Sequence, residues 1–196
     1  MQSFTPTYRI IKKSIFTSDD RGDKFNNLIF HIGMIELISY WKCACPKNVI
    51  IKCGYLNNDQ IEWFKKLYYY GLGEFFFINN IDISYVEFMN LSCDYDEQKI
   101  IYDNNESDYI GNIIPVGGGK DSIVTLELLH DIDRNYGFLI NPKKDSLDCL
   151  QTAGYNKENI IEVYRSIDSN LLKLNKEGYL NGHTPFSSIV AFVSYL

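Results

Sequence analysis

The sequence predicts an α/β protein in which helices flank a mostly parallel sheet. Two observations lead to this prediction: short apolar runs alternate with helix-length segments, and a glycine-rich stretch joins one such run to the next helical segment. Strands joined by helical crossovers are parallel, which gives the expected sheet its direction. Turn signals come largely from Asn and Asp, because only 5 prolines and 13 glycines occur in the 196 residues.

The first half of the chain is expected to form a smaller α/β region. Its predicted elements are a strand over 8–16, a helix over 28–41, a β-branched strand over 48–52, a helix capped by Asn58 or Asp59, and a strand over 74–78. The polar, turn-rich stretch 94–108 then indicates a boundary. We therefore expect an N-terminal α/β region over 1–108 and a second domain over 109–196.

The second half alternates more regularly. Its predicted elements are a strand over 113–116, a glycine loop, a helix over 122–130, a strand over 137–140, a helix over 146–153 and a strand over 160–164. A last helix is expected to start at Pro185 with Thr184 as its N-cap. Its apolar face ends at Leu196 without a glycine or a basic residue, so we expect the second domain to be incomplete at its C-terminus.

Composition excludes several classes of protein. The hydrophobic fraction of 45% and the many aromatic residues argue against disorder. The formal net charge is -6, so no nucleic-acid partner is expected without a local basic patch. The apolar run 187–196 has about half of the ~20 residues that a membrane span needs, so no membrane partner is expected either. Five cysteines without a secretory signal favour the cytoplasm rather than a disulfide framework.

The strongest chemical signal is the stretch from Ile113 to Ser122, which reads IIPVGGGKDS. Glycines before a helix expose backbone amides, and the helix N-terminus adds partial positive charge, so the stretch is typical of a phosphate-binding loop. A Walker A loop would need Gly where Ile114 stands and Ser or Thr where Asp121 stands, so the stretch is not a Walker A loop. A dinucleotide fingerprint would need Gly or Ala where Ser122 stands, so the match to that fingerprint is weak. The plain alternative is a tight strand-to-helix turn that Asp121 caps.

The loop resembles that of the PP-loop ATP pyrophosphatase superfamily, written Ser-Gly-Gly-x-Asp-Ser, with Gly117 in place of the first Ser. The resemblance implies an adenine-nucleotide alpha hydrolase-like fold and a loop that binds ATP. The phosphate-binding residues would be Gly117, Gly118, Gly119, Lys120 and Ser122. Asp121 would act in catalysis by holding Mg²⁺ directly or through water, since a carboxylate beside a triphosphate is tolerable mainly with a metal between them.

A second motif, Asn181-Gly182-His183-Thr184-Pro185, opens the last helix. In PP-loop proteins a late Gly-His loop flanks the nucleotide. By that resemblance His183 would be catalytic, contacting a phosphate or the leaving group, while Asn181, Gly182 and Thr184 would add contacts to the nucleotide. The plain alternative is a turn followed by an N-cap.

The two motifs together are similar to the bacterial UDP-N-acetylmuramoyl-L-alanyl-L-glutamate epimerase family. Asn141-Pro142 and the segments 30–42 and 71–76 are similar to that family as well. The resemblance implies an ATP- and Mg²⁺-dependent inversion of the terminal L-Glu of a UDP-MurNAc-peptide, with AMP and pyrophosphate as by-products. Adenylation would remove the carboxylate charge that makes the α-proton hard to abstract.

Other roles stay open at the level of sequence. A PP-loop ligase or thiolase, or a module that binds ATP without turnover, would carry the same loop. No base for the α-proton is assigned: Cys43, Cys45 and Cys53 are more simply buried thiols. His31 and Glu36 are more simply core or interhelical residues.

Overall fold

The computed structural model describes residues 3–11, 22–96 and 111–195. These residues form two compact units, each considered by itself. Unit 1 contains residues 3–4, 22–96 and 168–195, and unit 2 contains residues 5–11 and 111–167. The expected division at residue 108 stays a prediction about domain organisation. The two units are not continuous in sequence: the first strand belongs to the unit formed by the second half of the chain, and the last two helices belong to the unit formed by the first half.

Unit 2 is built on a four-stranded sheet in the order β1-β6-β5-β4. Its strands are β1 (Thr7–Ile11), β4 (Asn112–Pro115), β5 (Asn135–Ile140) and β6 (Ile160–Ser166). Strands β4, β5 and β6 are parallel, with Ile114 opposite Gly137 and Gly137 opposite Ile160, whereas β1 runs antiparallel to β6. The predicted α/β fold with a mostly parallel sheet is therefore confirmed for this unit. Residues 12–16 of the predicted first strand lie outside the described residues.

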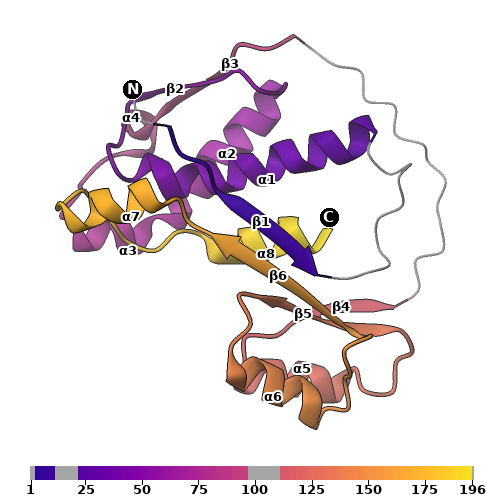
Figure 1. The fold of residues 1–196 in the computed structure, drawn as a ribbon. Helices are drawn as coiled ribbons and strands as arrows, with labels where there is room; N and C mark the ends of the chain where they lie inside the picture. Colours follow the sequence, from indigo (N-terminus) through magenta and orange to yellow (C-terminus); the bar gives the residue numbers. More distant parts are fainter. Residues whose placement is uncertain (1–2, 12–21, 97–110, 196) are drawn as a thin grey trace. The chain divides into compact units, whose positions relative to one another are not determined.

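Two helices cover one face of strands β4 to β6, as Figure 1 shows: α5 (Lys120–Leu128) and α6 (Lys144–Thr152). Leu126 of α5 and Leu150 of α6 pack with the strand residues Ile114 and Leu139 in one buried cluster. At Gly137 a Cβ would lie 2.4 Å from a methyl carbon of Leu150, so the glycine lets α6 approach the sheet. Both helices begin two residues before their predicted starts, within the usual uncertainty of helix ends.

Unit 1 is mainly helical around helix α1 (Asp23–Trp41), whose buried residues all lie from Ile32 onward. Its other helices are α2 (Asn58–Gly71), α3 (Gly73–Ile78), α4 (Tyr85–Phe88), α7 (Ser169–Lys176) and α8 (Phe186–Tyr195). Strands β2 (Asn48–Ile51) and β3 (Asn90–Cys93) pair in parallel. Helix α8 packs against α1 and buries Ile189 and Val193. It begins at Phe186, one residue after the predicted Pro185.

The predicted strand over 74–78 is wrong, because these residues form helix α3. Aromatic residues favour strands in general, but here Phe75 is fully buried while Phe77 is 83% exposed, and residues two apart on a strand would share one face. The Phe76 amide donates to the Leu72 carbonyl at 2.9 Å, so the chain resumes helical bonding directly after α2. Packing of Phe75 against Trp41 outweighs local propensity.

The cap of α2 lies one residue before the predicted position. Asn57, rather than Asn58 or Asp59, accepts the Gln60 amide at 2.8 Å, and the Gln60 side chain accepts the Asn57 amide at 2.9 Å. This reciprocal capping box satisfies two helix-start amides. Elements β3, α4 and α7 were not predicted; each is short, with a pattern too brief to indicate a strand or helix.

Candidate functional site

The glycine-rich loop of unit 2 follows strand β4 and leads into α5. Val116 is buried, and its amide donates to the Phe138 carbonyl at 2.9 Å, which extends the β4–β5 pairing to the last residue before the glycines. Gly119 is the N-cap of α5 with extended backbone. The helix starts at Lys120, so Asp121 lies in the first turn. The alternative interpretation, a tight turn in which Asp121 caps the helix, is therefore wrong about the cap. The Ile123 amide makes the first bond of the helix, to the Gly119 carbonyl, so the amides of residues 120–122 have no carbonyl partner within the helix.

A hydrogen bond across the loop holds its two ends together. The Gly117 amide donates to Ser122 Oγ at 3.0 Å, and the hydroxyl hydrogen of Ser122 stays available to donate. A Cβ at Gly119 would meet nothing within 4 Å, and one at Gly117 would meet only Ser122 Oγ at 4.0 Å. The loop backbone is thus open at both positions, which is the condition for close approach by phosphate oxygens.

Gly118 is required to be glycine by its backbone conformation and by its packing against α6. Its φ is +87°, and a Cβ there would lie 2.9 Å from the Ser146 backbone nitrogen at the start of α6. A side chain at this position would therefore be strained and would collide with α6. The structure explains this glycine by packing, and its place in a phosphate-binding loop stays a prediction.

Lys120 and Asp121 form an exposed ion pair beside the loop. Lys120 Nζ lies 2.6 Å from Asp121 Oδ1, and the two side chains are 88% and 89% exposed. No group of three His, Cys, Asp or Glu side chains in the described ranges is placed to hold a metal ion. Mg²⁺ commonly takes one or two carboxylates and completes its shell with water and substrate phosphates. One exposed carboxylate beside an open loop fits that manner of binding.

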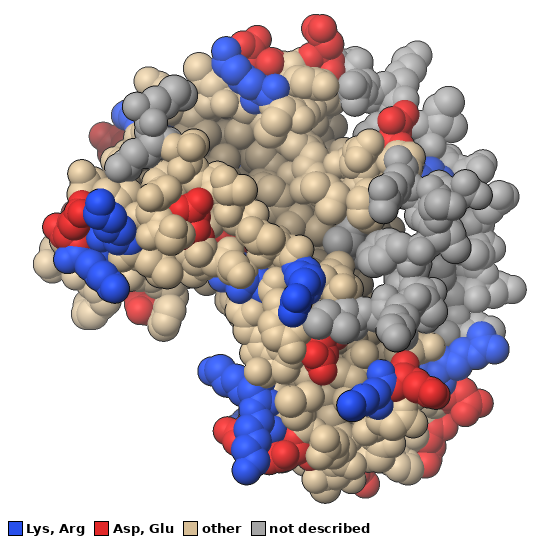
Figure 2. All heavy atoms as spheres, in the orientation of Figure 1, with Lys and Arg blue, Asp and Glu red and all other residues tan. Residues whose placement is uncertain are grey.

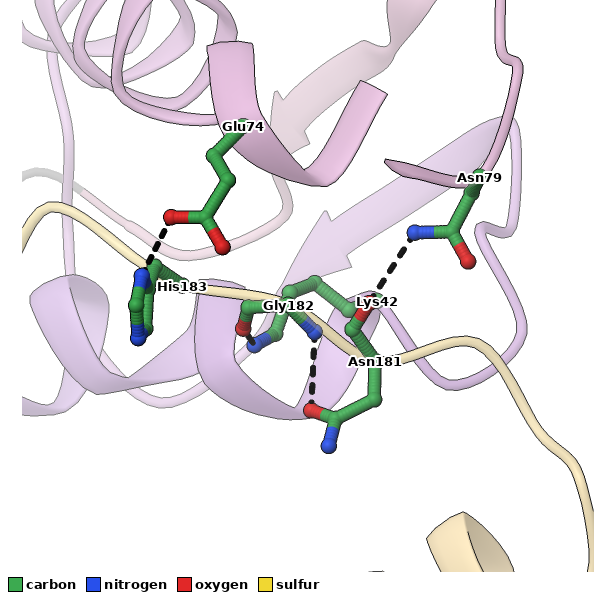
Figure 3. Close-up of polar contacts among 6 residues, drawn as sticks. All are labelled: Lys42, Glu74, Asn79, Asn181, Gly182 and His183. Atoms are coloured by element: carbon green, nitrogen blue, oxygen red, sulfur yellow. Dashed lines mark hydrogen bonds and ion pairs between the residues drawn. The ribbon is translucent and has the colours of Figure 1, made fainter. Parts of the chain in front are cut away.

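The second predicted motif lies in unit 1, where α3 and the residues after it bind it closely (Figure 3). Asn79 Nδ2 donates to the Asn181 carbonyl at 2.9 Å, and the buried Lys42 of the α1 C-cap donates through Nζ to the Gly182 carbonyl. The Gly182 amide donates to Asn181 Oδ1 at 2.9 Å. The loop backbone is therefore tied to two other segments of the unit.

Two glycines allow this close packing. A Cβ at Gly71 would lie 2.7 Å from Pro185 Cβ, and a Cβ at Gly182 would lie 3.0 Å from Phe75 Cα. Segments 71–76 and 181–185, which carry part of the family resemblance, are thus packed against each other although they are far apart in the sequence. Neither sequence pattern predicts this contact.

His183 contacts Glu74 from α3: His183 Nδ1 is in hydrogen-bond contact with Glu74 Oε2, and Figure 3 shows the two side chains pointing toward one another. The His183 side chain is 86% exposed, so the rest of its ring faces solvent. Thr184 accepts the Phe186 amide through its carbonyl at 2.6 Å, which leads the chain into α8.

The predicted site residues thus form two groups. Gly117 to Ser122 are together in unit 2, and Asn181 to Thr184 are together in unit 1. Sequence reasoning missed Glu74, Lys42 and Asn79. Glu74 lies inside segment 71–76, which is similar to the epimerase family. It was missed because the segment was predicted to be a strand, whereas Glu74 lies in the first turn of helix α3.

Cys43 and Cys45 are poorly suited to act as thiolate bases. All five cysteines are free thiols; Cys43 is buried and Cys45 is half-buried, but Cys53 is exposed, so the prediction of a buried thiol is wrong for Cys53. Burial raises the pKa of Cys43, and burial together with neighbouring Cys43 raises that of Cys45 to about 11. A catalytic thiol needs the opposite shift.

His31 has the predicted interhelical role. Its Nδ1 donates to the Asn27 carbonyl at 2.8 Å. The centroid of its ring lies 6.0 Å from that of Phe64 in α2.

Over the part of the chain that the structure describes, the charge distribution and the hydropathy of the helices indicate no further binding site. On the face shown in Figure 2, basic and acidic side chains are interspersed rather than gathered by sign. Among helices of the described residues, none combines the length and apolar character of a membrane span.

The fold and loop define a class: an α/β protein in which a parallel strand leads through an open glycine-rich loop into a helix, an arrangement that suits phosphate binding. The chain belongs to the MurL N-terminal domain family, whose model matches residues 1–196. The recognised epimerase family is thereby confirmed.

Three curated relatives are each named UDP-N-acetyl-alpha-D-muramoyl-L-alanyl-L-glutamate epimerase. The protein from Xanthomonas oryzae pv. oryzae is 24% identical over 81% of this chain and 34% of its own length. Those from Salinispora tropica and a Micromonospora species are 26% and 27% identical, over 98% and 83% of this chain and 41% and 35% of their own lengths. The chain thus spans between about a third and two fifths of these relatives. No solved structure gives a significant match, so the PP-loop superfamily assignment stays a prediction.

Proposed function

We propose that this chain is the nucleotide-binding part of an ATP-dependent epimerase that inverts the terminal L-Glu of UDP-MurNAc-L-Ala-L-Glu to D-Glu. The observation that carries the proposal is the match of the whole chain to the MurL N-terminal domain, in a protein whose β4–α5 loop is open at Gly117 and Gly119. The curated relatives' name supplies the substrate. A precursor of this kind is made in the cytoplasm, which is the proposed location.

In this proposal, the amides of the 117–119 loop and the first turn of α5 bind the outer phosphates of ATP. The Ser122 hydroxyl donates to a phosphate oxygen, and the Lys120 ammonium, now paired with Asp121, turns toward phosphate. Asp121 would hold Mg²⁺ directly or through water, and the ion would supply charge neutralisation at the phosphates. The substrate carboxylate attacks the α-phosphorus, and pyrophosphate leaves as the acyl-adenylate forms.

Activation explains why an isomerisation would consume ATP. The α-proton of a carboxylate is hard to remove, because the carbanion would lie beside a negative charge. Conversion to an acyl-adenylate removes that charge and lets the carbonyl oxygen accept the electron pair. Each ~1.4 kcal/mol removed from the barrier accelerates proton abstraction tenfold.

One incubation tests the proposal. The protein that contains this chain is incubated with ATP, Mg²⁺ and UDP-MurNAc-L-Ala-L-Glu, and AMP, pyrophosphate and the configuration of the glutamate are measured. The proposal predicts AMP, pyrophosphate and D-Glu in the peptide. AMP without inversion would instead indicate a PP-loop ligase or thiolase, and ATP binding without AMP would indicate a non-catalytic module.

A further inference from the structure

We propose that His183 and Glu74 are a proton-transfer pair: His183 is the catalytic residue that exchanges the α-proton of the activated glutamate, and Glu74 is the positioning residue that fixes the His183 ring. This inference rests on the proposed function and adds to it the base that sequence reasoning left unassigned. It starts from the contact of His183 Nδ1 with Glu74 Oε2, across 109 residues of sequence.

The backbone that carries His183 is held from several directions. Lys42 binds the carbonyl of the preceding residue, Gly182, and Asn79 binds the carbonyl of Asn181. Close packing of Gly182 on Phe75 and of Pro185 on Gly71 fixes the loop on both sides of the histidine. Functional side chains need such support, because a small misplacement of a reacting group is costly.

Stability does not account for this arrangement. The two side chains are 86% and 49% exposed, and exposed ion pairs contribute little to folding. A firmly held backbone that presents an exposed histidine is better explained by chemistry at the imidazole.

The contact sets the tautomer of the neutral ring. A carboxylate only accepts hydrogen bonds, so Nδ1 must carry the hydrogen when it faces Glu74. The other nitrogen, Nε2, then has a free lone pair, which is the form that a general base needs. The carboxylate also stabilises the imidazolium that forms when Nε2 takes a proton.

Nε2 of neutral His183 takes the α-proton of the acyl-adenylate, the Cα–H bond breaks, and its electron pair moves to the acyl oxygen as an enolate. Water on the opposite face returns a proton to Cα, and the hydroxide so formed accepts the proton of the His183 imidazolium. A second water then cleaves the acyl–phosphate bond, so AMP leaves and the glutamate carboxylate is restored. No oxidant or reductant takes part.

The first test separates proton transfer from adenylation. The protein containing this chain is incubated in D₂O with ATP, Mg²⁺ and UDP-MurNAc-L-Ala-L-Glu, and AMP release and deuterium at the glutamate Cα are both measured. For His183→Ala we expect AMP release to continue while deuteration falls by about 100-fold or more. Undiminished deuteration would overturn the pair alone, and so would a loss of AMP release in a folded variant. No AMP from the unmodified protein would overturn the proposed function together with the pair.

A second measurement does not depend on activity. In ¹⁵N-edited spectra of the neutral ring, His183 should show a protonated Nδ1 and an unprotonated Nε2. Glu74→Ala should increase the share of the Nε2–H tautomer and lower kcat with little change in KM, and Glu74→Asp should restore part of both. An unmodified His183 found mainly as the Nε2–H tautomer would overturn the role of Glu74.

The chain offers a matched control in His130 and Asp131, an exposed His–carboxylate pair of adjacent residues whose Nδ1–Oδ1 distance is 3.2 Å. His130→Ala should leave AMP release and deuteration unchanged. A deuteration loss equal to that of His183→Ala would show that removing any surface histidine has the same effect, and would overturn the assignment.

Discussion

Glu74 at the start of α3 contacts His183 in the loop before α8, and this contact joins two segments that are 109 residues apart. Around it, a Cβ at Gly71 would collide with Pro185 at 2.7 Å, and a Cβ at Gly182 would press on Phe75 at 3.0 Å. The contact therefore belongs to a packed unit of two motifs. Its integrity depends on the small residues around it as well as on the His183–Glu74 contact.

The glycine at position 71 should be required for this packing. Gly71→Ala places a Cβ 2.7 Å from Pro185 Cβ, so the loop must move. We expect a loss of about 1–3 kcal/mol in the free energy of unfolding, measured by urea denaturation. Gly73→Ala is the control, since its Cβ meets nothing within 4 Å. Equal stabilities of the two variants would contradict the packing.

The glycines of the 117–119 loop should separate into a structural and a binding position. Gly118→Ala, with its φ of +87° and the backbone of α6 at 2.9 Å, should lower the melting temperature. Gly119→Ala has open space and should leave the melting temperature nearly unchanged, while weakening ATP binding because the new methyl group stands where phosphate approaches. Calorimetric titration with Mg²⁺–ATP measures the second effect. A stable Gly118→Ala variant would contradict the first.

Asp121 should be needed for chemistry but not for folding. Its side chain is 89% exposed and pairs only with the equally exposed Lys120 among the contacts found in the described chain. Asp121→Asn should therefore abolish pyrophosphate release while thermal unfolding stays the same. Asp131→Asn, which removes another exposed carboxylate, should keep full activity. Normal pyrophosphate release by the Asp121 variant would remove this residue from the site.

The hydroxyl of Tyr85 should have a raised pKa, and its hydrogen bond should lower the pKa of Glu62. Burial, followed by the 2.8 Å hydrogen bond to Glu62, raises the pKa of Tyr85 to about 12. Because the folded-state pKa is raised, the stability it contributes is complete below about pH 10 and is lost as pH rises toward about 12. The same hydrogen bond is the main reason that the pKa of Glu62 is lowered, so Tyr85→Phe should raise it. NMR titration checks both, and an unchanged Glu62 pKa would contradict the coupling.

Sequence reasoning succeeded where the pattern was local. The strands and helices of 113–166 alternate regularly, and the glycine loop lies where it was expected, because apolar runs there are separated by amphipathic segments long enough to indicate helices. It failed at 74–78, where three successive phenylalanines have strand propensity but the helix is fixed by burial of Phe75 near Trp41.

The candidate site residues, too, were predicted only where the pattern was local in sequence. The residues of each motif were found from their types and order. Glu74, Lys42 and Asn79 were not found, because their meaning depends on a contact made only after α1, α3 and the late loop have packed together. The exchange of β1 and of α7 and α8 between the two halves is likewise set by tertiary pairing, which no local pattern encodes.

Binding of ATP phosphates by the β4–α5 loop is the central claim, and backbone amide shifts test it most directly. A ¹⁵N-labelled protein titrated with Mg²⁺–ATP should show its largest shifts at the amides of Gly117, Gly119 and the first turn of α5, and adenosine alone should leave these amides in place. Saturating Mg²⁺–ATP that leaves the loop amides unmoved would contradict the account.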